Sequence, residues 1–449
     1  MTKITTAREF LANAVRRNLA AMFPGHFDGA KHNHYADYGW PTSVTFQQLY
    51  AMYERNSVAT AAVNKTARKV WETIPAVRHA EQGDDETPAE KEIRQRFDDL
   101  GVWRALAECH RRSMVGRYAG AILRIGDGKQ LREPVDSVTG GLDALVEVIP
   151  AWEGQLTVAE WDTDEASPTY GKPLMFRFNE TAIGESKIGR MASIHPDRVV
   201  IWSQDGTVNA RSLLMAGYND LIDMEKIKGA GGEGFWKNAK GAPVLEVDKE
   251  ARLAEMAQAM GVQADALLEA MNDQVEDWQK GFDKLLMMQG MTAKTLPTVL
   301  PDPEPFFGVS LQSFAASVEI PVKVLVGMQT GERASQEDAD EWARTCMGRR
   351  SDSVVPAIME MINRLEAWGI IPAADWWLDW EDLTEAGMPE RMDRAAKMAA
   401  INAQAYDYTE GGIVFTDDEI RDVVGMEPLA DAGMAREDDT PPEDEESEI

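Results

Sequence analysis

The chain has 449 residues, enough for about three domains or one elaborate domain. Hydrophobic residues make up 44% and charged residues 27%, an ordinary globular composition that excludes a mainly disordered or fibrous chain. Lys and Arg number 46 and Asp and Glu number 76, which gives a formal net charge of −30. This charge argues against a wide basic surface that binds nucleic-acid phosphates tightly. It does not exclude a protein past which nucleic acid moves without tight binding.

Cys109 and Cys346 are the only cysteines, too few and too far apart for a disulfide scaffold or a zinc site. We expect both to be reduced core thiols in a protein made in the cytoplasm. The first 23 residues are typical of a short amphipathic helix and have no signal-peptide core or cleavage site. No stretch approaches the roughly 20 apolar residues that span a bilayer, so we expect a soluble protein without a membrane partner.

Residues 41–115 are predicted to be helical. Apolar side chains recur at helical spacing over residues 58–71, and Asn56 or Ser57 is suited to cap that helix. Residues 87–90, Thr-Pro-Ala-Glu, form a capping box with proline at the first helical position. This box predicts the start of another helix.

Residues 116–202 change character, because short runs of β-forming residues alternate with turn signals. The predicted strands are residues 121–125, 145–150, 156–161, 174–178 and 198–202. A mostly antiparallel β module that follows a helical one predicts the α+β fold class.

Helix returns from about residue 211 and is predicted to end at Gly229–Gly232, where a helix cannot readily continue. Two further helical segments are expected at residues 248–260 and 264–288. A proline-broken, extended stretch and one more short helix then lead to about residue 327.

A polar loop with a glycine, residues 328–335, precedes the longest helical pattern of the chain. That pattern covers residues 336–368, with Ser335 suited to cap it, and would span about 50 Å if continuous. A second capping box starts at Thr416. Residues 437–449 hold eight carboxylates and no Lys or Arg, the composition of a disordered acidic tail.

Candidate catalytic groups do not combine into a site. His32-Asn33-His34 suggests a metal site or a nuclease-like motif, but further ligands are missing, and a polar surface arm is the preferred interpretation. His195 has no assignable partner for general-base catalysis. The sequence has no P-loop, no GxSxG elbow and no paired His-x-Ser/Thr elements. No cofactor or metal is therefore expected.

Tryptophans cluster at residues 376–380, where carboxylates flank them. Aromatic platforms that stack single-stranded nucleic acid lie in basic grooves instead. Packing in the core or at a subunit interface is the better interpretation of this cluster.

Several segments occur in an order typical of one family. They are YERNSVATAAVNKTARKVW, AGAILRIGDG, the Ile149–Trp152 element, SPTYGKP, IHPDRVVIW, VEIPVKVLVGMQTGERASQEDADEW, WLDWEDLTEAGMPERMDRAAKMAAINAQAY and DDEIRDVVG. In this order and spacing the sequence resembles bacteriophage portal proteins over roughly residues 40–428.

The resemblance implies a portal-type subunit with a helical stem and tunnel helix, a mixed α/β wing, a small clip and a helical crown. The implied segments are an N-terminal arm (1–40), wing (41–210), first stem helix (211–239), clip (240–303), second stem helix (304–327), channel loop (328–335), tunnel helix (336–368), wing completion and crown (369–428) and acidic tail (429–449).

The resemblance also implies a ring of about twelve copies at one capsid vertex of a virion, through which DNA is packaged and ejected. The implied partners are further copies of the chain, double-stranded DNA, the large terminase, the major capsid or scaffolding protein, and a head-completion or tail adaptor protein. Such a ring is not an enzyme.

Two groups of site residues follow from the resemblance. The channel loop would present Gln329, Thr330, Gly331, Glu332 and Arg333 to DNA. The tunnel helix would carry Glu337, Glu341, Arg349 and Arg350. Related sequences tend to have a glutamine midway along this helix, where this chain has the two arginines, so the lining of the helix departs from the family pattern.

Two alternatives stay open from the residues alone: a phage-encoded hydrolase or nuclease, and an adaptor or scaffold protein without a channel. The acidic tail supplies eight negative charges and leaves −22 on residues 1–436. Around a channel, such charge would repel phosphates and limit sticking. We expect carboxylates toward the bore, with basic residues near 323–350 and in the clip.

Overall fold

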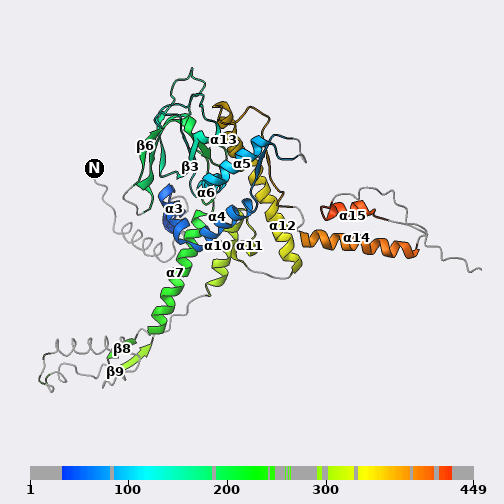
Figure 1. The fold of residues 1–449 in the computed structure, drawn as a ribbon. Coiled ribbons are helices and arrows are strands. Elements are labelled where there is room, and N and C mark those ends of the chain that lie inside the picture. The colour runs from blue at the N-terminus through cyan, green and yellow to red at the C-terminus, as the bar shows by residue number, and fades with distance from the viewer. Residues whose placement is uncertain are drawn as a thin grey trace, which may run out of the picture. The chain divides into compact units, whose positions relative to one another are not determined.

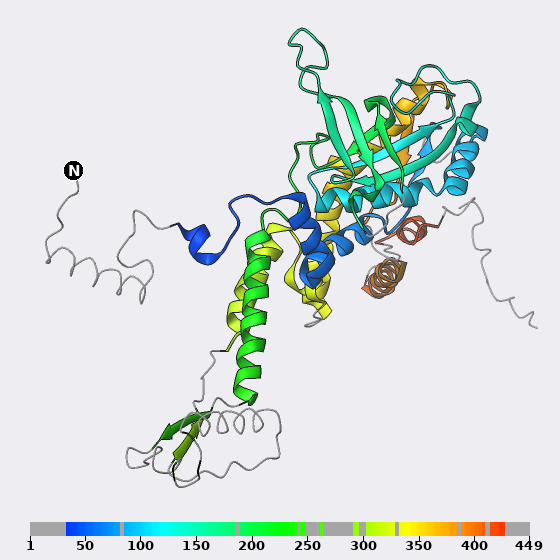
Figure 2. The same ribbon diagram turned by 90° about the vertical axis from the view of Figure 1, so that its left-hand side faces the viewer.

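We describe the protein from a computed structural model (Figures 1 and 2). The structure describes residues 33–80, 85–184, 189–240, 243–247, 258, 261, 263, 291–295, 302–327, 332–384, 388–408 and 414–426. The chain divides into two compact units, residues 1–381 and 382–449, and each is described by itself.

The first unit begins with a helical part. Its helices are α2 (His34–Tyr38), α3 (Phe46–Arg55), α4 (Ser57–Val70), α5 (Pro88–Leu100) and α6 (Val102–Val115). Asn56 caps α4, because its side chain accepts hydrogen bonds from the backbone N–H groups of Val58 and Ala59. Thr87 and Glu90 form the complete capping box of α5. The sequence predicted both of these helix starts correctly.

Two three-stranded antiparallel sheets follow. The first has the order β3–β2–β7, and the second has the order β4–β5–β6. Their bounds are β2 (Ala119–Ile125), β3 (Leu145–Trp152), β4 (Leu156–Trp161), β5 (Pro173–Asn179), β6 (Met191–Ile194) and β7 (Val199–Trp202), with 3₁₀ turns η1 (Gly141–Ala144), η2 (Glu180–Ala182) and η3 (Pro196–Arg198) between them. All five predicted strands are confirmed, and the α+β class holds. Strand β6 was not predicted, because its four residues include only one that is buried.

The two sheets approach closely at Gly120 in β2. A Cβ atom at this position would lie 2.2 Å from Cδ2 of Leu156 in β4, so only glycine fits there without a shift. Phe176 and Phe178 of β5 pack with Leu156 and Ile122 in the core between the sheets. The small residue in β2 therefore sets the distance between the layers.

A short antiparallel pair, β1 (Ala76–Arg78) with β10 (Trp377–Asp379), joins two distant parts of the chain. Trp376, next to β10, is buried, and the indole N–H groups of Trp377 and Trp380 donate to the carbonyl oxygens of Ala80 and Thr73. These contacts confirm that the tryptophan cluster serves packing within the subunit.

Helices α7 (Tyr218–Lys240), α10 (Glu304–Ser317) and α11 (Val322–Val326) come next. Two expectations about α7 were wrong. The helix begins at Tyr218 rather than 211, because the Ser212 hydroxyl group holds the preceding segment to the carbonyl oxygens of Met114 and Val115. It also continues past Gly229–Gly232. A glycine ends a helix by adopting the left-handed conformation, and the glycines in this stretch have no positive φ.

The two halves of α7 differ in their surroundings. Leu221 and Met224 are buried in a core that also contains Phe314 of α10. From residue 225 to 236, no residue of α7 is buried. Helices α7 and α10 lie side by side, and α7 extends beyond the end of α10 (Figure 2).

Strands β8 (Pro243–Val247) and β9 (Met291–Thr295) form an antiparallel pair within the predicted clip, residues 240–303. The helices expected at 248–260 and 264–288 fall outside the described residues except for residue 258.

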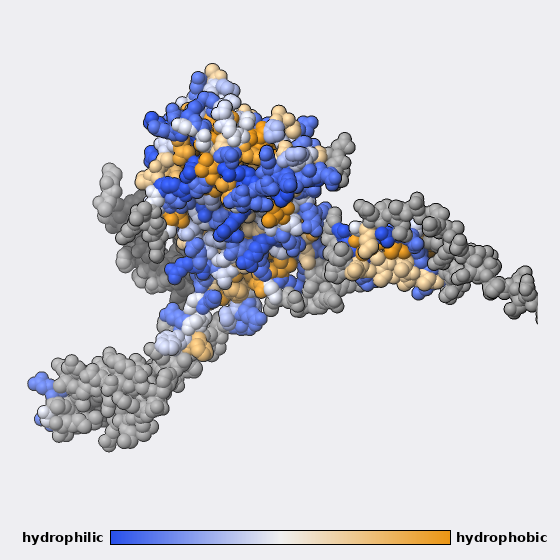
Figure 3. All heavy atoms as spheres, in the orientation of Figure 1, coloured by the Kyte–Doolittle hydropathy of each residue, from blue (hydrophilic) through white to orange (hydrophobic). Residues whose placement is uncertain are grey.

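The second unit contains α14 (Met388–Tyr408) and α15 (Asp417–Val423), a helical hairpin. Thr416 and Glu419 form the predicted capping box of α15. The side chain of Asn402 binds the backbone of Val414 and Phe415 and holds the connection against α14. Apolar side chains such as Met392 remain at the surface of this hairpin (Figure 3).

Candidate functional site

A long helix lies where the tunnel helix is predicted, but it starts earlier than expected. Helix α12 (Glu332–Arg349) is followed by a π-helical turn, η4 (Arg350–Val354), and by α13 (Val355–Ala367). Glu332 and Arg333 therefore belong to the helix and not to the channel loop, and Ser335 does not cap it. The first turns of α12 contain no glycine or proline and carry acidic residues, which favour a helix N-terminus. The other loop residues, Gln329, Thr330 and Gly331, lie outside the described residues.

An ion pair joins the two helices that flank the predicted loop. Lys323 Nζ on α11 lies 3.4 Å from Asp338 Oδ2 on α12. Lys65 Nζ on α4 also donates to the carbonyl oxygen of Val324 at 2.5 Å, which fixes α11 to the helical part. The segment between α11 and α12 therefore starts and ends at anchored positions.

Glu337 and Glu341 lie one turn apart on α12, so they occupy the same face of the helix. Both are exposed, as are Asp340 and Arg344 near them. This part of α12 therefore exposes three carboxylates and one arginine, and whether it faces a channel stays a prediction.

Arg350 lies on the long helix, but it is buried and so cannot line a channel. Its Nε donates to the carbonyl oxygen of Val70 at 2.8 Å, and its Nη1 donates to the carbonyl oxygen of Glu381 at 2.6 Å. The guanidinium carbon also lies 4.1 Å from the ring centre of Trp380. Arg350 therefore joins α4 to the segment after β10.

Arg349 is half-buried, and its surroundings differ from those of Arg350. It borders a cavity of about 330 Å³ together with Glu319, Asp352 and other polar residues. Burial lowers the pKa of Arg349, while the nearby Cys346 and Glu319 act in the opposite direction. Neither of the two predicted arginines is thus a fully exposed cation on the helix surface.

The π-helical turn has a local cause. Pro356 has no N–H group and cannot continue an α-helical ladder toward Asp352. The wider turn precedes it, and the hydroxyl groups of Ser351 and Ser353 donate to the carbonyl oxygens of Gly348 and Arg349. The helix thereby passes the proline without ending.

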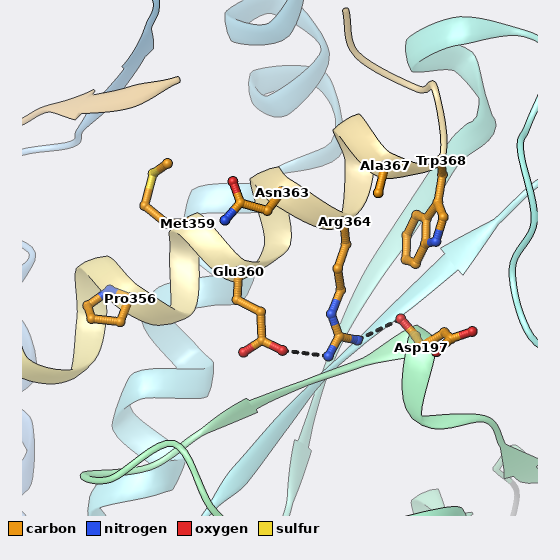
Figure 4. Close-up of a pocket in the computed structure, with 8 residues that line it drawn as sticks. All are labelled: Asp197, Pro356, Met359, Glu360, Asn363, Arg364, Ala367 and Trp368. Atoms are coloured by element: carbon orange, nitrogen blue, oxygen red, sulfur yellow. Dashed lines mark hydrogen bonds and ion pairs between the residues drawn. The ribbon is translucent and has the colours of Figure 1, made fainter. Parts of the chain in front are cut away.

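A groove of about 420 Å³ lies between α13 and η3 (Figure 4). Arg364 crosses it, with Nη1 within 2.6–2.9 Å of the carbonyl oxygens of Pro196, Asp197 and Val199, and Nη2 2.5 Å from the Glu360 carboxylate. Because the subunit itself engages this guanidinium group, the groove is a junction between the helix and the first sheet.

The histidines considered as catalytic have other surroundings. His195 Nδ1 accepts a hydrogen bond from the backbone N–H of Asp197 and caps η3. His34 stacks on Tyr38 at the surface, and His32 lies outside the described residues. His110, which does not fit the His-x-Ser/Thr pattern, is buried. Its Nδ1 accepts a hydrogen bond from the Trp71 indole, and burial lowers its pKa to about 3.

Within the described ranges, no group of three or more His, Cys, Asp or Glu residues could hold a metal ion. The same ranges contain no helix that is long and apolar enough to cross a membrane.

Comparison with known proteins identifies the family. A family model described as phage portal protein matches residues 47–404. A chain from the neck of an empty GTA particle computed with C6 symmetry is 14% identical, with 86% of this chain and 95% of that chain covered and a TM-score of 0.48. A chain from the neck of a native GTA particle computed with C12 symmetry is 14% identical, with 85% and 94% covered and a TM-score of 0.44.

A chain from the virion of a native gene transfer agent particle is also 14% identical, with 86% and 95% covered and a TM-score of 0.46. No curated protein sequence matches significantly. Because the family model covers most of the sequence, the chain belongs to the phage portal protein family. It is a portal-type connector and a component of a virion.

Proposed function

We propose that this portal protein forms a closed ring of about twelve copies at one capsid vertex, around a channel for DNA packaging and ejection. The observation that carries the proposal is the stem. Helix α7 leaves the core and has no buried residue from 225 to 236. A helix half without a core is stabilised when neighbouring copies pack against it, which a ring provides.

The channel surface is proposed to include residues 328–331 and the first turns of α12. Glu337 and Glu341 are exposed there. Carboxylates on a wall repel phosphates, so DNA would slide past without the tight grip of a basic groove. Arg350 is removed from this surface by its burial, and Arg349 is only partly accessible.

The segment assignments are proposed with corrected bounds. The wing comprises residues 41–210 together with the strand β10, and the stem comprises α7 and α10. The clip covers about residues 241–303, the tunnel helix residues 332–367, and the crown the α14–α15 hairpin. By analogy with the family, the clip would contact the large terminase and the head-completion or tail adaptor protein, and the wing would contact the major capsid or scaffolding protein.

The purified chain tests the ring directly. We expect particles with a central hole in negative-stain images and a light-scattering mass near twelve times 49.8 kDa, roughly 600 kDa. A folded monomer or dimer at micromolar concentration, both alone and with its scaffolding protein, would contradict the ring and favour a channel-free adaptor.

The loop provides a second test, on function rather than assembly. Deletion of Gln329–Gly331 should leave ring formation intact, because Lys323 and Asp338 still anchor the flanking helices. DNA packaging into procapsids should fall strongly. Replacing the same three residues with Gly-Ser-Gly is the matched control for loop length. Normal packaging by the deletion variant would show that this segment does not act on DNA.

A further inference from the structure

The second sheet ends in a strand with an open edge. Among the strands that the structure describes, β6 pairs with β5 alone, and no register shift interrupts this pairing. The carbonyl oxygen of Arg190 accepts a hydrogen bond from the residue after β5, so Ala192 and Ile194, at every second position, turn their backbone groups toward β5. The N–H and C=O groups of Met191 and Ser193 therefore point to the outer side of β6.

A hydrogen bond at the end of β6 shows that this outer side can bind a further chain segment. The N–H of His195 follows the same alternation and points outward, and it donates to the carbonyl oxygen of Leu131 at 2.9 Å. No residue of the described ranges binds the outward backbone groups of Met191 and Ser193. Both side chains are exposed as well. An unpaired row of N–H and C=O groups is a template for one more strand.

Two other edges of the sheets are protected in ways that β6 is not. At the edge of β7, the Arg364 side chain of α13 donates to the carbonyl oxygen of Val199 at 2.9 Å. Strand β4 has register shifts on both sides of Glu160. Covering groups and bulges of this kind hinder the addition of another strand. The regular edge of β6 is therefore better suited to accept one.

A groove of about 820 Å³ lies beside this edge. Ala192 and Ser193 of β6 contribute to its lining, and the ends of β2 and β3 and the loop after β2 contribute the rest. Leu131 on this loop and Val146 on β3 make part of the lining apolar. The groove thus offers space for a chain segment directly next to the open backbone groups.

Buried contacts hold the loop that lines the groove. Arg198 is 0% exposed, and its Nε donates to the carbonyl oxygen of Glu133 at 2.9 Å. Its Nη2 lies 2.6 Å from Asp127 Oδ2, at the start of the same loop. Because one buried guanidinium group binds both parts of the loop, the shape of the groove is fixed by the fold.

The ionisable residues that line the groove are all basic. They are Arg124, Lys129 and Arg132, and no carboxylate of the described residues lines it, although the chain carries a net charge of −30. Arg124 and Lys129 form ion pairs with Glu147 and Asp136 at the surface, where such pairs are weak. Arg132 is exposed and has no ion pair within the described ranges. The groove therefore favours an acidic partner.

The open edge favours a peptide over a nucleic acid. Phosphate groups only accept hydrogen bonds, so they would leave the outward carbonyl oxygens of Met191 and Ser193 unpaired. An extended peptide both donates and accepts at a spacing of two residues, which matches these two positions. Its side chains alternate, so acidic groups can meet the cations while apolar groups meet Leu131 and Val146.

We propose that the outer edge of β6 is a docking site for an extended acidic segment of a partner protein, which adds as a further strand beside Met191 and Ser193. Backbone hydrogen bonds to these two residues provide affinity. The cations Arg124, Lys129 and Arg132 select carboxylate side chains. The site belongs to a single subunit, so it does not depend on the proposed ring.

A synthetic peptide tests the site on the full chain. Fluorescein-labelled Glu-Val-Glu-Val-Glu-Val should bind in fluorescence anisotropy, and Lys-Val-Lys-Val-Lys-Val should not, because the groove is cationic. The acidic peptide with N-methylated valines keeps its charges but loses half of its backbone donors, and it should bind much more weakly. Equal binding of the acidic peptide and its N-methylated form would overturn strand addition, and so would absence of binding at millimolar concentration.

Two substitutions at Ser193 separate the backbone from the side chain. Ser193→Pro removes the outward N–H, and an edge strand tolerates proline where the N–H faces solvent. It should weaken binding of the acidic peptide by about three- to tenfold. Ser193→Ala keeps the N–H and is the matched control, with binding expected to stay unchanged. Equal binding by both variants would overturn the proposal, and so would equal loss in both.

Charge reversal tests the cations. Arg132→Glu should weaken binding of the acidic peptide by about three- to tenfold. The control is Arg104→Glu, which changes the net charge equally at an exposed position of α6 outside the groove. It should leave binding unchanged. Equal effects of the two variants would show a general attraction between charges and overturn the role of the groove.

Amide hydrogen exchange examines the edge without any substitution, and it decides the matter if Ser193→Pro does not fold. The amides of Met191 and Ser193 should exchange fast in the chain alone and slowly with the acidic peptide. The amide of Ile194, which faces β5, should exchange slowly in both samples. Slow exchange of Met191 and Ser193 in the chain alone would mean that the chain or a neighbouring copy already covers the edge, and it would overturn the proposal.

The remaining outcomes separate the docking site from other roles. Displacement of the acidic peptide by a short duplex DNA would assign the groove to nucleic acid and overturn the proposal. Peptide binding by a chain that forms no rings would support the docking site and contradict the proposed function. Rings that do not bind the peptide would contradict the docking site alone.

Discussion

Glycines and large side chains have different surroundings in two regions of the first unit. One region is the body, which we define as its packed helices and sheets, and the other is the outer half of α7, residues 225–236. In the body, Gly120 is required by a neighbour 2.2 Å away, and the buried Arg350 is satisfied by acceptors of the same subunit. In the outer half of α7, Gly231 has no neighbour that requires it, and Phe235 is left exposed. Residues in the first region serve folding of the subunit, whereas no contact in the described part of the subunit accounts for those in the second.

The largest predicted effect is the loss of stability on replacing Arg350, a buried residue of the body. Arg350→Met should lower the free energy of unfolding by about 3–5 kcal/mol, because it leaves the carbonyl oxygens of Val70 and Glu381 without their charged donor. Urea denaturation measures the change. The matched control is Arg344→Met on the exposed face of α12, which should change it by less than about 0.5 kcal/mol. Equal effects of the two variants would contradict the contrast between buried and exposed arginines.

A smaller effect should appear in the pH dependence. Burial alone would raise the pKa of Glu90, but hydrogen bonds from the N–H groups of Ala80, His79 and Thr87 outweigh it and lower the pKa from 4.5 to about 2. A lowered pKa in the folded state gives stability that is present above pH 4.5 and is lost as the pH falls toward 2.

Glu90→Gln should therefore lower the free energy of unfolding by about 2–3 kcal/mol at pH 7 and by much less near pH 2. Thermal unfolding at several pH values measures this. Glu92→Gln, on the exposed side of α5, is the control and should leave the curve unchanged. A constant difference across the pH range would show that Glu90 acts through packing instead.

The smallest effects compare a glycine just before α7, Gly217, with a glycine at the middle of that helix, Gly229. Gly217→Ala should destabilise by about 1–3 kcal/mol, because its methyl group would overlap Phe314 and Ser317. Gly229→Ala should stabilise the subunit by up to about 1 kcal/mol, because its methyl group meets open space and alanine favours the helix. The two shifts in melting temperature should have opposite signs. Shifts of the same sign would mean that the outer half of α7 is packed like the body.

Local signals explain most of what the sequence predicted correctly. The capping boxes at Thr87 and Thr416 and the five β-forming runs act within a few residues, so they can be read without the fold. The continuation of α7 through Gly229–Gly232 was missed because a glycine permits a helix end without enforcing one. The packing role of the tryptophans was inferred from the carboxylates beside them.

Distant partners explain most of what the sequence did not predict. Arg350 was placed on the tunnel helix, and the long helix does contain it. However, its hydrogen-bond acceptor, the carbonyl oxygen of Val70, lies 280 positions away in the sequence. Local sequence patterns cannot predict a contact over this separation. The buried pair of Arg198 with Asp127 is similar, since the two residues are 71 positions apart. The candidate channel residues 329–331 stay a prediction.

The π-helical turn at Arg350–Val354 changes how the long helix should be drawn on a helical wheel. A π turn inserts one extra residue, which rotates everything after it by about 100° relative to an uninterrupted α-helix. Glu337 and Glu341 before the turn and Glu360 and Asn363 after it therefore belong to separate angular frames. Residues that share one face of this helix are therefore found with two wheels, one that ends at Arg349 and one that begins at Val355.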